Sequence, residues 1–95
     1  MKFLYLAIHY PKPERVQDLL EGMQHLAKVL ENASGLIEAH AWQEQAGERI
    51  VATSFWRSED EFRQALPLIG KTVRAMPFSE WEARPREILR LDEVI

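Results

Sequence analysis

Hydrophobic and polar positions form a sequence of blocks along this chain that predicts alternating strands and helices. Residues 2–10 are apolar on both faces and rich in strand formers, which is typical of a central strand. Apolar residues then recur every three or four positions from Pro13 to Leu30, which predicts a helix with one buried face. The segment Asn32-Ala33-Ser34-Gly35 ends that helix, because glycine can adopt the left-handed conformation common at helix ends.

The middle of the chain predicts a hairpin followed by a capped helix. Residues 36–43 and 49–56 alternate as two strands around a short turn. Ser58 is a good N-cap for the next helix, and Glu61 completes a capping box with it. We expect Pro67 to break or restart this helix.

After that proline the pattern predicts three shorter pieces. A further helical stretch covers residues 68–76, a connector with Phe78 and Trp81 covers 77–84, and a last strand covers 86–91 or slightly beyond. The complete order is β-α-β-β-α-β. It predicts one α+β domain over residues 1–95, of the ferredoxin-like type: a four-stranded antiparallel sheet with both helices on one face.

The sheet face without helices is expected to be rich in aromatic and small apolar side chains. We expect strands one and three to be neighbours and parallel, which would bring His9 and Trp56 to the same end of the sheet. The residues predicted for this open face are Phe3, Tyr5, Ala7, His9, His40, Trp42, Ile50, Ala52, Ser54 and Trp56. Because so much apolar surface rarely stays exposed, we expect a homodimer that packs through this face and can enclose a cavity.

Composition excludes several classes of protein. A formal net charge of −3 argues against general nucleic-acid binding, which needs clustered Lys and Arg. The chain has no cysteine, and therefore no disulfide or thiolate site. With no secretory leader pattern and no apolar run of membrane-spanning length, we expect a cytoplasmic protein that binds no membrane.

Two histidines are the candidates for acid–base chemistry. Imidazole titrates near neutral pH, so His9 or His40 could act as a general base. The alternative for His9 is a hydrogen-bonded interface histidine, and for His40 a polar group within a wet dimer cavity. The two histidines and Glu38 lack a tight ligand spacing, so we expect no metal site.

The aromatic side chains admit two interpretations. Tyr5, Trp42 and Trp56 could form a flat slot for a planar ligand, and Arg86 could steady developing negative charge. Aromatic residues in the strands of a small domain are, however, more often core or interface anchors.

The segment Phe55-Trp56-Arg57-Ser58-Glu59-Asp60-Glu61-Phe62, a strand ending in Trp before x-Ser-x-x-x-Phe with acids between, resembles the antibiotic biosynthesis monooxygenase-like proteins of the dimeric α/β-barrel superfamily. The resemblance extends over nearly the whole element order. It implies a dimeric α/β barrel and a cofactor-independent monooxygenase that acts on a small planar phenol or quinol. Some of the residues that the phenol-oxidising members of the family place around their substrate correspond here to Trp56, His40, Tyr5 and Arg86.

The haem-opening branch of the same superfamily is disfavoured. It uses an asparagine late in the first strand and an axial histidine in the second helical region, where this chain has Ala7 and the histidine-free residues 68–74. The alternative from a different class is a non-catalytic dimer with a ligand-binding, structural or regulatory role.

Overall fold

Four strands form one sheet in the computed structural model, which describes residues 1–95. The strands are β1 (Phe3–Pro11), β2 (Leu36–Gln43), β3 (Ile50–Trp56) and β4 (Glu82–Asp92), and their order across the sheet is β2-β3-β1-β4. All three neighbouring pairs are antiparallel. The helices are α1 (Val16–Leu30), preceded by a 3₁₀ turn (Pro13–Arg15), α2 (Glu59–Arg74) and the single turn α3 (Phe78–Trp81).

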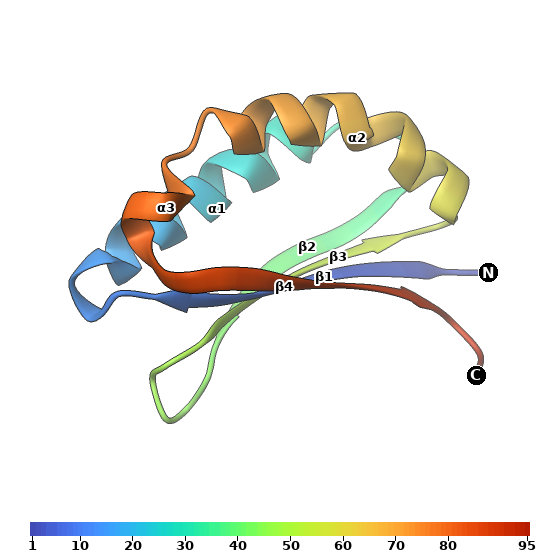
Figure 1. The fold of residues 1–95 in the computed structure, drawn as a ribbon. Helices are drawn as coiled ribbons and strands as arrows, with labels where there is room; N and C mark the ends of the chain where they lie inside the picture. The colour runs from blue at the N-terminus through green and yellow to red at the C-terminus, as the bar shows by residue number, and fades with distance from the viewer.

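Figure 1 shows α1 and α2 across one face of the sheet, while the other face is bare. The predicted ferredoxin-like order with helices on one face is confirmed. The first and last strands lie side by side, so that α3 and the start of β4 sit next to the end of β1.

The predicted parallel pairing of strands one and three is wrong. Phe3 lies opposite Trp56, and His9 lies opposite Ile50. The crossover through α1 makes β1 and β2 parallel, and the hairpin turn then reverses β3, so β3 runs antiparallel to β1. His9 and Trp56 therefore lie at opposite ends of the sheet, six strand positions or roughly 20 Å apart.

The predicted assignment of sheet faces is also wrong for strands one and three. Phe3, Ala7, His9, Ile50 and Trp56 are buried on the helix side instead of lying on the open face. Both faces of β1 are apolar, so its pattern alone could not decide which face the helices cover. The bare face is still apolar, but it carries the other alternating set: Leu4, Leu6, Ile8, Val51, Phe55, Leu89 and Leu91.

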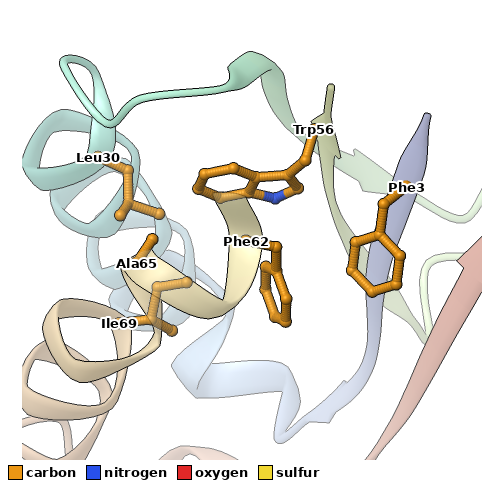
Figure 2. Close-up of a cluster of buried hydrophobic side chains, with 6 residues drawn as sticks. All are labelled: Phe3, Leu30, Trp56, Phe62, Ala65 and Ile69. Atoms are coloured by element: carbon orange, nitrogen blue, oxygen red, sulfur yellow. The ribbon is translucent and has the colours of Figure 1, made fainter. Parts of the chain in front are cut away.

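An aromatic cluster closes the interface between helices and sheet near the end of β3. Figure 2 shows the Trp56 indole beside the Phe62 ring, with Phe3 on the neighbouring strand. The ring centroids of Trp56 and Phe62 are 5.6 Å apart, and those of Phe3 and Phe62 are 5.0 Å apart. Both Trp56 and Phe62 are fully buried. Leu30, Ala65 and Ile69 complete the cluster.

The start of α2 agrees with the prediction. Ser58 is its N-cap, and the Ser58 hydroxyl accepts a hydrogen bond of 3.2 Å from the backbone N–H of Glu61. Gly35 has a φ of +86°, as expected for the break after the first helix. The Trp56-to-Ser58 junction thus joins a strand end that anchors the core to a capped helix.

The predicted break at Pro67 is wrong, because α2 continues through this residue. Proline in a helix interior costs about 3 kcal/mol or more. Here the buried stripe of Phe62, Ala65, Ile69 and Thr72 runs on across it, and burying Phe62 and Ile69 alone contributes a comparable gain of roughly 1.5–3 kcal/mol each. The last strand begins at Glu82, earlier than predicted, because the connector is shortened to the single turn α3.

Candidate functional site

A cavity of about 710 Å³ lies between the helices and the sheet. Its floor is made by two neighbouring rows of sheet residues, all small except Tyr5: Ala7 and Ala41 flank Ala52, and Tyr5 and Ala39 flank Ser54. A row of three alanines across three strands leaves space that the helices above do not fill. The walls from α1 and α2 are mainly apolar, including Leu26, Ala27 and Val73. Both the volume and the apolar lining are those of a small-molecule site.

A buried histidine–carboxylate pair lies at one end of this cavity. Nδ1 of His9 is 2.6 Å from Oε1 of Glu82, and the side chains of both residues are only 5% exposed. Because a carboxylate only accepts hydrogen bonds, the neutral imidazole carries its proton on Nδ1 and leaves Nε2 free to take a proton. The pair therefore has the arrangement of a base and the group that orients it.

Burial decides the protonation state of His9. Desolvation lowers its pKa below the ordinary 6.5, and the nearby Arg86 lowers it further, while the hydrogen bond and the charge of Glu82 raise it. The net direction is downward, so His9 is neutral at pH 7. A neutral imidazole with a fixed tautomer is the form that can act as a base.

An irregularity in β4 brings the pair together. Opposite β1, the register shifts between the pairs Ile8–Glu87 and Tyr10–Arg84, and shifts again before Pro11–Glu82. Such bulges re-aim side chains, and prolines in strands are common at them. Pro85 lies within the bulge, and the extra residues of β4 place Glu82 beside His9.

The turn α3 closes this end of the cavity. The Phe78 ring is nearly parallel to the His9 imidazole, with centroids 5.7 Å apart, and the Arg86 guanidinium lies over the Phe78 ring at 4.8 Å from its centroid. Trp81 packs against α1 at Gly22, where an added Cβ would come within 2.9 Å of the Trp81 ring. His9, Phe78 and Arg86 form one contiguous group at the cavity wall.

Only part of the predicted site lies at this cavity. Tyr5, His9 and Arg86 line it. His40 borders it, but strand alternation places its side chain opposite to those of Ala39 and Ala41. The His40 side chain is half exposed, and its Nε2 is 3.8 Å from Oε1 of Glu38. Its ring is in edge contact with the Trp42 ring.

The two predicted tryptophans lie elsewhere. Trp42 is 54% exposed on the bare face, where its Nε1 donates a hydrogen bond to the Thr53 hydroxyl. Trp56 is fully buried in the aromatic cluster, and its Nε1 donates to the Ser54 hydroxyl. The structure therefore does not bring Tyr5, Trp42 and Trp56 together as a slot.

Sequence reasoning missed Glu82 and did not connect Phe78 with His9. The available signal was topological: antiparallel pairing of the first and last strands places an acid that begins the last strand beside the end of the first. The β4 bulge, which sets the exact pairing, has no comparably clear signature.

Two kinds of feature are not found in the structure. No group of three or more His, Asp or Glu side chains is arranged to hold a metal ion. None of the helices has the length and apolar character required to cross a membrane.

Comparisons with known proteins support the fold and indicate a family. The family model described as antibiotic biosynthesis monooxygenase matches residues 5–66. No curated protein matches the sequence significantly. A structure of Rv0793 from Mycobacterium tuberculosis superposes with a TM-score of 0.85 at 16% identity, covering 100% of this chain and 97% of that one. A conserved protein from Methanosarcina mazei Go1 gives 0.84 at 20% identity, with coverages of 96% and 91%.

A third similar structure has a stated activity. It is a mutant of SnoaB, a cofactor-independent oxygenase from Streptomyces nogalater, with a TM-score of 0.80 at 15% identity and coverages of 99% and 94%. At these identities the likeness of the three structures concerns the fold.

Proposed function

The chain belongs to the antibiotic biosynthesis monooxygenase family, and on this basis we propose that it is a cofactor-independent oxygenase of a small planar phenol or quinol. The observation that carries the proposal is the buried pair of Glu82 with His9, in which His9 lines an apolar cavity. The family match and the activity stated for SnoaB support the reaction class.

The proposed reaction begins with proton transfer to His9. Removing the phenolic or activated C–H proton of a bound substrate gives an electron-rich anion that can itself reduce dioxygen. For an anthrone-type substrate, a CH₂ group becomes a carbonyl: one oxygen atom stays in the product, and the other leaves as water with the two hydrogens. No external reductant is needed.

The surrounding residues have distinct roles in this proposal. Glu82 holds the imidazole in one tautomer and stabilises its charged form after proton transfer. The Arg86 guanidinium stabilises developing negative charge on the substrate. Phe78, which lies next to both His9 and Arg86, supplies the ring contact that the sequence led us to expect from Trp42 and Trp56.

We also propose that the protein works as a cytoplasmic homodimer formed through the bare sheet face. Trp42, Leu89 and Leu91 on that face are 54%, 45% and 41% exposed, and the residues between them are mainly apolar. A surface of this kind favours a partner. Light scattering during size-exclusion chromatography should show a dimer that Leu89→Asp dissociates, whereas a monomeric wild type would contradict the proposal.

Oxygen uptake with an anthrone substrate tests the activity. We expect His9→Gln to lower kcat/KM by about 10²–10⁴-fold, the usual contribution of a general base. Glu82→Gln should give a smaller loss, since the base remains but is oriented less well. His40→Gln is the matched control and should leave the rate within about twofold, because its side chain points away from the cavity floor.

Two results would contradict this proposal. One is the absence of oxygen uptake across a panel of anthrones and quinols by protein whose circular dichroism shows it folded. The other is a large loss in the His40 variant together with full activity in the His9 variant.

A further inference from the structure

The charged side chains that line the cavity are basic, although the Glu82 carboxylate lies behind them, in contact with His9. The protein as a whole has 15 acidic and 12 basic residues other than histidine, yet no Asp or Glu lines the cavity. Its charged lining residues are Arg74 from the end of α2 and Arg86 from β4. An acidic protein thus has a cavity whose charged lining side chains are positive.

These two arginines also lack carboxylate partners within the protein. Five of the eight arginines form ion pairs with Asp or Glu: Arg15, Arg49, Arg57, Arg63 and Arg84. Arg74, Arg86 and Arg90 form none. Arg90 lies outside the cavity, where its guanidinium is 5.1 Å from the centroid of the Phe62 ring. Arg74 and Arg86 are therefore free to pair with a bound anion.

The local structure accommodates both guanidinium groups. The Arg86 guanidinium lies over the Phe78 ring, which in turn stacks on the His9 imidazole. Arg74 folds back along α2 over Gly70, one turn earlier, where an added Cβ would come within 2.9 Å of Arg74 Nη1. The missing side chain at position 70 leaves the space that this guanidinium occupies.

We propose that the cavity binds a planar aromatic compound that carries a carboxylate, with the carboxylate held by Arg86 and Arg74 and the ring held between the alanine floor and the apolar helix residues. Guanidinium groups match carboxylates in geometry and can bind them through two parallel hydrogen bonds. This inference rests on the proposed function for the location of the substrate, and it adds the chemical class that the cavity selects.

Calorimetric titration with three matched probes tests the inference: 1-naphthoate, 1-naphthol and 1-naphthyl phosphate. We expect wild-type protein to bind 1-naphthoate at least tenfold more tightly than the other two. Arg86→Gln and Arg74→Gln should each weaken naphthoate binding several-fold, and the double variant should bind naphthoate and naphthol equally. Gly70→Ala should weaken naphthoate binding alone, because it displaces the Arg74 guanidinium.

Arg90→Gln is the matched control, since it removes the third unpaired arginine from the same strand as Arg86. It should leave the preference for naphthoate unchanged. The inference is overturned if naphthoate does not bind, if naphthol binds equally well, if the phosphate binds more tightly, or if the Arg90 variant loses the preference as well. The binding experiment requires no turnover, so the two proposals can fail separately. If the protein binds naphthoate selectively but takes up no oxygen with the anthrones and quinols, the oxygenase proposal is refuted and this inference stands.

Discussion

The two ends of the space between helices and sheet differ in the size of the side chains that face it. At the Trp56 end, the large rings of Phe3, Trp56 and Phe62 pack together, and Trp56 and Phe62 are fully buried. Nearer to His9, alanines occupy the corresponding sheet positions and a cavity of about 710 Å³ remains. The same two layers are thus filled by large rings at one end and separated by a cavity at the other.

The largest difference between the ends should appear in the free energy of unfolding. Phe62→Ala removes a fully buried ring and should lower this energy by about 3–5 kcal/mol, from lost burial and the new cavity. Leu20→Ala, at the wall of the existing cavity, should cost only about 1 kcal/mol, because that side chain is half buried and already faces space. Urea denaturation measures both, and equal costs would contradict the contrast between the ends.

A smaller effect is expected at the junction that leads from the Trp56 end into α2. Ser58→Ala removes the hydroxyl that caps the helix and should cost about 1 kcal/mol. Gln64→Ala, an exposed position of the same helix, serves as the control and should change stability by less than about 0.5 kcal/mol. Thermal and urea unfolding of both variants would show whether the cap contributes. No loss in the Ser58 variant would mean that packing alone fixes the start of α2.

The smallest effect concerns pH and the His9 end. The pKa of His9 in the folded protein lies below its ordinary value of 6.5, so the unfolded chain binds the proton more readily. The resulting stabilisation is fully present above pH 6.5 and is lost as pH falls through the lower, folded-state value. The free energy of unfolding should therefore decrease from pH 7.5 to pH 5.

In His9→Gln this decrease should be smaller. His40→Gln is the matched control for the loss of a histidine, since its side chain contacts Glu38 and Trp42 and not the His9–Glu82 pair. Carboxylates such as Glu44 and Glu61, whose pKa values are lowered by Arg49 and Arg57, affect stability at lower pH, below about 4.5. If the free energy of unfolding of the His9 variant depended on pH as that of the wild type does, the lowered pKa of His9 would be contradicted.

The sequence was sufficient for the order of elements and for the helix cap, because both depend on local patterns. Ser58, Glu61 and Gly35 have preferences that act within a few residues. The predictions failed where the answer depended on contacts distant in sequence. Because both faces of β1 are apolar, its sequence did not reveal which face the helices cover. In α2, the buried residues on both sides of Pro67 outweighed the helix-breaking tendency of this proline.

The same division holds for the candidate site. His9, Tyr5 and Arg86 could be chosen from their chemistry and their positions in strands, and all three line the cavity, but Tyr5 and His9 were predicted for the open face and the cavity lies on the helix side. Glu82 could not, because its proximity to His9 depends on the pairing of strands separated by most of the chain and on the bulge in β4. Trp56, selected for its place at a conspicuous junction, instead anchors the packed end.

The most direct test of the open end is methyl NMR on protein labelled with ¹³C at alanine and leucine methyl groups, titrated with 1-naphthoate. A ligand in the cavity between helices and sheet should shift the methyl signals of Ala7, Ala41 and Ala52, through its ring current, and leave those of Leu4, Leu89 and Leu91 on the bare face unchanged. Shifts confined to the bare-face leucines, with the three alanines unaffected, would contradict the account.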